Sequence, residues 1–164
     1  MPRGAIRNVR ARELQGQRAG FVSRLAAGAI DVAAIFGMYV LVLLVVGLLR
    51  FLLTEEELKL PRPDLILTII LFNLLGVVMF STAWSGSGRT IGDDIVGLRV
   101  VTATGGDVTS GRALARALIL AVTVGLALVP AIWSKRNNGL HDWLCRTTVV
   151  YAWRPRSLES RPHE

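Results

Sequence analysis

Three long stretches of this chain contain no charged side chain: residues 32–49, 65–84 and 117–133. A transmembrane α-helix needs about 20 mostly apolar residues to cross the hydrocarbon core of a bilayer, which is about 30 Å thick. The core of a soluble domain of 164 residues does not need uncharged runs of this length. The runs therefore exclude a soluble globular domain and predict an all-α membrane protein.

Two of the stretches predict helices that span the membrane. The first helix covers about residues 25–49, would rise about 37 Å, and has Asp31 as the one charge inside it. The second covers residues 65–84, would rise about 30 Å, and has Asn73 as its one strongly polar interior residue. The third stretch, residues 117–133, would rise only about 25 Å if straight. It is therefore expected either to span the membrane or to re-enter it from one side.

The segment that follows the second stretch has a different composition. Residues 95–102 are rich in β-branched side chains, a Thr-Gly-Gly turn follows, and Val108 and Thr109 resume the pattern. This pattern predicts a short β-hairpin outside the bilayer. Residues 147–152 are a second strand candidate. Ser110 is expected to be the N-cap of a helix that then enters the membrane.

The distribution of charge predicts the orientation of the protein. Six arginines lie within residues 1–24 and four within residues 86–116, whereas residues 51–64 contain four acidic side chains and two basic ones. Lysine and arginine favour the cytoplasmic side of a membrane. We therefore expect a protein of the bacterial inner membrane whose N-terminus and residues 86–116 lie in the cytoplasm. The basic arm is expected there either to contact anionic lipid headgroups or to be a solvated tail that only sets the orientation.

The C-terminal tail distinguishes two topologies for residues 117–133. Three full crossings would place the tail, with its six cations, outside the cell. A re-entrant or kinked segment keeps every basic region in the cytoplasm and lets residues 96–102 pair with residues 147–152 in a small cytoplasmic β element. We expect the second topology, although each limb of the segment would be short. The expected organisation is a basic cytoplasmic arm (1–20), a membrane domain (21–152) and a basic polar tail (153–164).

Arg24 and Asp31 form the most distinctive local pattern in the chain. Residues seven apart lie on nearly the same face of a helix, about 10.5 Å apart along its axis. A carboxylate at that depth is costly unless it is paired or protonated, so Asp31 is a candidate functional residue. Two interpretations stay open: Asp31 binds an ion or a proton, or it fixes helix packing by bonding to a neighbouring arginine or hydroxyl.

Three separated blocks of the sequence resemble one known family. The blocks are GFVSRLAAGAID (20–31), GRTIGDDIVGLRVVTATGGDVTSGRALAR (88–116) and GLHDWLCRTTVV (139–150). They are similar, in the same order, to blocks of the RDD family, small bacterial multi-pass membrane proteins named for one arginine and two aspartates. The resemblance covers about residues 20–152. It implies a multi-pass membrane fold, and cation/proton antiport is attributed to some members of the family.

The resemblance also implies roles for particular residues. The naming residues of the family correspond to Arg24, Asp31 and Asp142, and an arginine that the family usually carries early in the third apolar segment corresponds to Arg116. One departure concerns the position after the glycine matched by Gly92. A basic residue is common there, whereas this chain has two aspartates at 93 and 94.

Several kinds of site are not supported by the sequence. Cys145 is the single cysteine, so no intrachain disulfide and no CxxC metal site can form. A metal-dependent phosphohydrolase dyad at His141 and Asp142 would need more ligands, and the second histidine is the penultimate His163. The glycine-rich turns lack the GxxxxGK[ST] pattern of a phosphate-binding loop. We therefore expect no cofactor, no metal and no enzymatic activity. Nucleic-acid binding is not expected either, because the cations flank apolar spans instead of forming a basic face.

Two functions remain compatible with these residues. In the first, the protein moves protons or small cations through Asp31, with Arg24, Arg116 and Asp142 as an electrostatic gate. Two full spans cannot enclose a pathway, so this protein would act as an oligomer. In the second, the protein is a non-catalytic interaction or assembly subunit in which the same charges hold helices together. The expected partners are the lipid bilayer and either further copies of the chain or another membrane protein. Three residues are candidates for a supporting role: Asn73, His141 and Arg112.

Overall fold

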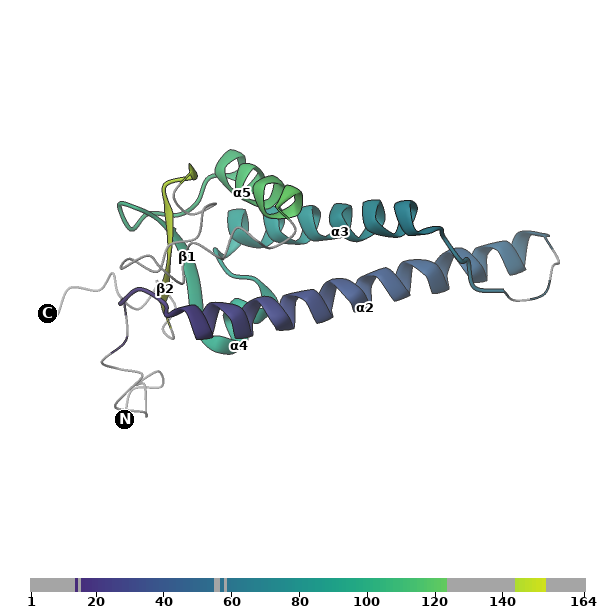
Figure 1. The fold of residues 1–164 in the computed structure, drawn as a ribbon, viewed down its shortest axis with the longest axis horizontal. Coiled ribbons are helices and arrows are strands. Elements are labelled where there is room, and N and C mark those ends of the chain that lie inside the picture. Colours follow the sequence, from purple (N-terminus) through teal and green to yellow (C-terminus); the bar gives the residue numbers. More distant parts are fainter. Residues whose placement is uncertain (1–13, 15, 55–56, 58, 124–143, 153–164) are drawn as a thin grey trace, which may run out of the picture.

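The computed structural model describes residues 14, 16–54, 57, 59–123 and 144–152. Two long helices form an antiparallel hairpin, and the short elements gather at the end of the hairpin where the first helix begins (Figure 1). The elements, in chain order, are α2 (Phe21–Thr54), α3 (Leu65–Gly86), α4 (Ile91–Val96), β1 (Leu98–Thr102), α5 (Ser110–Val122) and β2 (Thr147–Tyr151).

Helices α2 and α3 are long and apolar enough to cross a membrane. Most of their large apolar side chains are exposed, which suits a surface that faces lipid and not water. The start of α3 agrees with the predicted boundary, and the Asp64 side chain caps it by accepting the N–H of Leu67 at 2.8 Å. Helix α2 is longer than predicted, because it begins at Phe21 and continues to Thr54. Its 34 residues rise about 51 Å, so α2 is longer than a hydrocarbon core is thick.

Strands β1 and β2 form an antiparallel pair in which Leu98 lies opposite Tyr151 and Thr102 opposite Thr147. The predicted pairing of these two segments is therefore present. The chain before α2 runs along the other edge of β2, where the N–H of Ala19 donates to the Val149 carbonyl at 2.8 Å. Strand β2 thus joins residues 16–19 to β1, although these segments lie far apart in the sequence.

The predicted hairpin within residues 95–109 is wrong. Residues 95 and 96 belong to α4, and the residues after the Thr-Gly-Gly turn form no strand, so the partner of β1 is β2. The reason is local: the side chain of Thr90 caps α4, and Gly97 ends it with a left-handed backbone (φ 79°). The helix boundary after the turn also differs by one residue, because Thr109 occupies the N-cap position and Ser110 is the first residue of α5.

Helix α5 packs against α3 through one face (Figure 1). The buried residues Ala113, Arg116 and Ala117 follow the i, i+3, i+4 spacing of a helix with one covered face. The remainder of the third apolar stretch, residues 124–133, lies outside the described residues. Whether residues 117–133 span or re-enter a membrane therefore stays a prediction.

A small core fixes the short elements to the end of the hairpin. Leu98 and Val100 of β1 are fully buried, and they belong to one cluster with Trp84 of α3, Ala117 of α5 and Val149 of β2. We call residues 16–20, 87–109 and 144–152, which include α4 and both strands, the cap. Because α3, α5 and the cap all contribute residues to this core, the core sets the positions of the polar side chains described next.

Candidate functional site

The face of α2 that lies against the cap bears two buried ionisable side chains. Arg24, Ala27, Asp31 and Ile35 are the buried residues of its first half, and their spacing of three or four places them on a single stripe. Arg24 is 6% exposed and Asp31 is 3% exposed. Ionised side chains are seldom buried to this extent unless they are paired or hydrogen-bonded, so the partners of this stripe define the site.

Both carboxylate oxygens of Asp31 accept hydrogen bonds from the start of α4. The hydroxyl of Thr90 donates to Oδ2 at 2.6 Å, and the backbone N–H of Gly92 donates to Oδ1 at 2.8 Å. Charge-assisted hydrogen bonds of this kind are among the stronger ones in proteins. Of the interpretations that the sequence left open for Asp31, a bond to a neighbouring hydroxyl is therefore present in the structure.

The contact between α2 and α4 depends on a glycine. A Cβ atom at Gly92 would lie 2.0 Å from the carbonyl oxygen of Ala27 and 2.7 Å from its carbonyl carbon. No larger residue fits there unless the two helices separate. The absence of a side chain at Gly92 therefore lets its N–H reach Asp31.

Thr90 also connects Asp31 to a second buried carboxylate, that of Asp93. The Thr90 hydroxyl donates to Asp31 and accepts the N–H of Asp93 at 3.0 Å, so it uses both its donor and its acceptor capacity. Asp93 completes a capping box by accepting the N–H of Thr90 at 3.2 Å. Its Oδ2 atom also accepts the indole N–H of Trp84 at 3.4 Å, which ties the end of α3 to α4.

Arg116 approaches the same region from α5. Its guanidinium carbon lies 4.4 Å from the ring centroid of Trp84, within the range of a cation–π contact. One guanidinium nitrogen donates to the Thr147 hydroxyl of β2 at 2.7 Å. Phe80 stacks on the Trp84 ring with a centroid separation of 4.9 Å. Arg116 thus joins α5, α3 and β2 while it is only 3% exposed.

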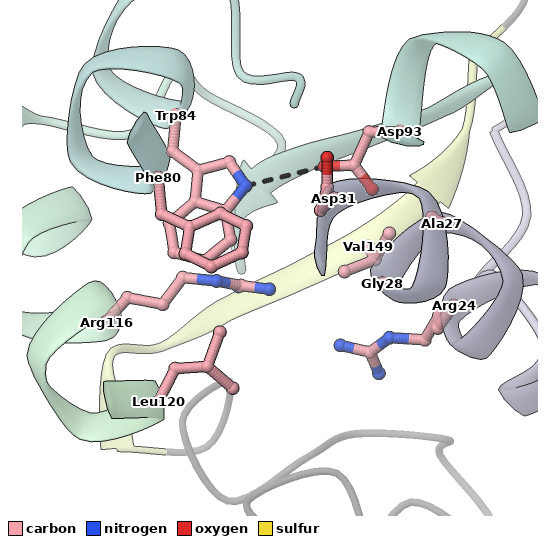
Figure 2. A pocket seen from close by; sticks show the side chains of 10 residues that line it. All are labelled: Arg24, Ala27, Gly28, Asp31, Phe80, Trp84, Asp93, Arg116, Leu120 and Val149. Carbon is pink, nitrogen blue, oxygen red and sulfur yellow. Dashed lines mark hydrogen bonds between the residues drawn. The ribbon is translucent and has the colours of Figure 1, made fainter. Parts of the chain in front are cut away.

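These side chains surround a cavity of about 70 Å³, which we call the charged cavity. Arg24, Asp31, Asp93 and Arg116 line it together with apolar side chains and Trp84 (Figure 2). Figure 2 shows the guanidinium groups of Arg24 and Arg116 pointing toward one another, one from α2 and one from α5. A cavity of this volume has room for several water molecules or for a small polar group.

The charged residues of this cavity lie within the part of the chain that matches a known protein family. The RDD family model matches residues 18–146, which include all four charged residues of the cavity. This chain belongs to the RDD family. The match confirms the resemblance seen in the three sequence blocks. No curated protein and no solved structure matches the chain.

In this RDD protein the structure brings together three of the predicted site residues. Arg24, Asp31 and Arg116 line one cavity, although they come from helices separated by up to 92 positions in the chain. Asp142, predicted to complete the set, and His141 lie outside the described residues, so their contacts stay predictions.

Two residues predicted to support the site lie away from the charged cavity. Asn73 bonds within its own helix, where its side-chain nitrogen donates to the Ile69 carbonyl at 2.9 Å, and it is not among the residues that line the cavity. Arg112 is exposed on α5 and does not line the cavity either. Neither position therefore contributes to the cavity that holds Asp31.

Sequence reasoning missed Thr90, Gly92, Asp93 and Trp84. The two aspartates after Gly92 were noticed as a departure from the RDD pattern, but they have different roles: Asp93 is buried in the site, whereas Asp94 is exposed and pairs with Arg89 at 3.0 Å. A usable signal was present, because Thr90 and Asp93 have the spacing of a capping box. Among the described residues, no three His, Cys, Asp or Glu side chains are grouped so that they could hold a metal ion.

Proposed function

We propose that this RDD protein is a non-catalytic membrane assembly module in which the buried charges fasten the α2–α3 hairpin to the cap. One observation carries the proposal: both oxygens of Asp31 are bonded to α4, at Thr90 and at Gly92. Removing one partner from a buried charge leaves that charge unsatisfied and typically costs several kcal/mol. Such a junction would hold the cap in one orientation at the membrane, where it can present a surface to another protein.

The proposal includes a topology in the bacterial inner membrane, with the N-terminus and the cap in the cytoplasm. Residues 16–31, 84–116 and 144–152 contain seven arginines and four aspartates, so the end of the hairpin that bears the cap is the basic one. Residues 16–19 are hydrogen-bonded to β2, which supports a topology in which these two segments lie on the same side of the membrane. An even number of crossings between β1 and β2 would follow.

A second candidate function is the handling of protons or small cations by an oligomer. Its support is that Asp31 and Asp93 line the charged cavity together with two arginines, so ionisable groups face a space that water can enter. The two described spanning helices do not enclose a pathway by themselves. In this alternative, further copies of the chain would supply the remaining walls.

Proton-coupled flux in liposomes separates the two candidates. The wild-type protein and the Asp31→Asn variant are reconstituted, and proton movement is measured against a gradient of Na⁺ or K⁺. The assembly module predicts no flux for either protein and a lower unfolding temperature for Asp31→Asn. Flux in the wild type that is lost in Asp31→Asn would favour transport and overturn the assembly proposal.

A matched control for this experiment is Asp107→Asn. Asp107 is an exposed cap residue whose carboxylate lies 3.1 Å from Arg99. Exposed ion pairs contribute about 0–1 kcal/mol, so this variant should unfold close to the wild-type temperature. If the unfolding temperature of Asp107→Asn falls as far as that of Asp31→Asn, the loss of any carboxylate lowers stability, and the effect is not specific to the buried bonds of Asp31.

A further inference from the structure

A large apolar groove adjoins the charged cavity. It lies between α2, α3 and α5 and has a volume of about 690 Å³. Its walls include apolar side chains such as Leu25 and Val32 of α2 and Phe72 and Val77 of α3, and the polar side chain of Asn73 also lines it. This volume lies within the range of about 300–1,000 Å³ that is typical of ligand pockets. The groove is therefore large enough for an extended hydrocarbon chain.

The groove and the charged cavity lie next to each other and share part of their lining. Gly28 of α2, Phe80 of α3 and Leu120 of α5 line both of them. A molecule that fills both spaces would place a polar group between two arginines and an apolar chain along the helices. Few biological molecules have this combination, and a phospholipid is the one that surrounds a membrane protein.

We propose that the charged cavity and the groove together bind one anionic glycerophospholipid. Its phosphate lies between the guanidinium groups of Arg24 and Arg116, and one of its acyl chains lies in the groove. The inference rests on the membrane placement proposed above, but it does not depend on the choice between assembly and transport. It assigns a ligand to the pair of arginines at the centre of the site.

The chemistry of the two arginines fits a phosphate. They come from different helices, both are buried, and their guanidinium groups point toward one another (Figure 2). Arginine presents five N–H donors in a planar fork, so it can bind a phosphate oxygen in addition to a protein acceptor such as Thr147. Basic pockets between membrane helices on the cytoplasmic side are typical sites for anionic headgroups.

The two carboxylates of the cavity do not oppose this assignment. The oxygens of Asp31 accept from Thr90 and Gly92, and those of Asp93 accept from Thr90 and Trp84. These donors offset part of the negative charge of the two carboxylates and so reduce their repulsion of a phosphate. The hairpin end as a whole has seven arginines against four aspartates within residues 16–31, 84–116 and 144–152, which favours an anionic headgroup over a zwitterionic one.

The groove identifies a lipid and not a free phosphate as the ligand. Its α2 wall includes side chains that are about half accessible, Leu25 (53%) and Val32 (54%), so the groove is not closed on this side. An acyl chain passes from surrounding hydrocarbon into such a groove without leaving an apolar environment, so its entry costs little. The arginines then supply the preference for the headgroup, because the chain alone does not distinguish one phospholipid from another.

Lipid binding to the full-length protein in non-ionic detergent tests the proposal by native mass spectrometry. Phosphatidylglycerol and phosphatidylcholine with identical acyl chains are compared, together with glycerol 3-phosphate. We expect the dissociation constant to be at least about tenfold lower for phosphatidylglycerol than for phosphatidylcholine. Equal binding of the two lipids would overturn the proposal, and so would glycerol 3-phosphate displacing the lipid at equal concentration.

Two pairs of variants place the lipid. Arg24→Gln should weaken phosphatidylglycerol binding about tenfold, whereas Arg112→Gln, which removes an exposed arginine of α5, should leave it within about twofold. Equal losses would mean nonspecific attraction to surface charge and would contradict the site.

The second pair probes the groove without touching the arginines. Ala29 lines the groove, whereas Ala33 is exposed on the same helix and does not line it. Ala29→Phe should therefore reduce phosphatidylglycerol binding, and Ala33→Phe should not. This pair keeps the test decisive even if Arg24→Gln fails to fold. Unchanged binding by Ala29→Phe would exclude an acyl chain from the groove, and neither result bears on the flux measurement for Asp31.

Discussion

Replacing Gly92 by alanine should separate the cap from α2. The added Cβ would lie 2.0 Å from the Ala27 carbonyl oxygen, whereas real Cβ atoms essentially never approach closer than 3.0 Å, so α4 must move by about 1 Å. That displacement would lengthen the 2.8 Å bond from the Gly92 N–H to Asp31 to about 3.8 Å, beyond hydrogen-bonding distance. The same movement would lengthen the neighbouring 2.6 Å bond from Thr90 to Asp31 to about 3.6 Å, so this bond would be lost as well.

The expected loss of stability follows from these two bonds. A hydrogen bond to a charged group contributes about 1.5–3 kcal/mol, so losing both costs about 3–6 kcal/mol. For a protein of this size, a loss of this magnitude corresponds to a fall in the unfolding temperature on the order of 10 °C. Thermal unfolding of the purified protein in detergent, followed by the fluorescence of its tryptophans, measures this fall.

Gly111→Ala is the matched control. Gly111 lies in the first turn of α5, and a Cβ atom there meets no other atom within 4 Å. Alanine also favours a helix over glycine by up to about 1 kcal/mol, so this variant should be as stable as the wild type or slightly more stable. If Gly92→Ala unfolds within a degree or two of Gly111→Ala, the close contact between α4 and α2 is not what holds the cap.

Three further predictions concern the same region. Arg116→Gln removes the cation over the Trp84 ring, so we expect thermal unfolding to show a loss of about 1–2 kcal/mol; wild-type stability would contradict the cation–π contact. Arg24→Ala and Asp142→Ala should each destabilise the protein, and the double variant should be less harmful than their sum by about 1 kcal/mol; strict additivity would show that the two residues do not interact. A reporter that is active only in the periplasm should stay inactive when fused after Glu164, because both ends of the chain are expected in the cytoplasm; activity there would mean an odd number of crossings.

The long helices could be predicted from sequence because they depend on a regional property. Uncharged runs of 18 or more residues indicate helices that can span a membrane, whatever their neighbours are. Helical geometry equally predicts that Arg24 and Asp31 lie on the same face of their helix, since seven residues are close to two turns. The pairing of the two strand segments was predicted from their β-branched composition and from the placement of basic residues on one side of the membrane.

The details of the site could not be predicted in the same way. The contact of Gly92 with Ala27 depends on how two helices approach each other, and neither residue type reveals that distance. Residues 95 and 96 have strand propensity, yet the Thr90 cap and the Gly97 turn place them in a helix. Asp93 departs from the family pattern, and the sequence does not reveal that it is buried. Its burial depends on the position of Trp84, which the sequence alone does not give.

The coupling between Asp31 and Thr90 tests the central claim most directly. A double-mutant cycle compares the free energies of unfolding of the wild type, Asp31→Ala, Thr90→Val and the double variant. The cycle cancels the contribution of Thr90 to the capping of α4, because that contribution is present whether or not Asp31 is changed. If the buried carboxylate fastens α2 to the cap, the coupling energy should be about 1.5–3 kcal/mol, as expected for a hydrogen bond to a charged group. Additivity within about 0.5 kcal/mol would contradict the account, because Asp31 would then contribute nothing through the bond that joins it to the cap.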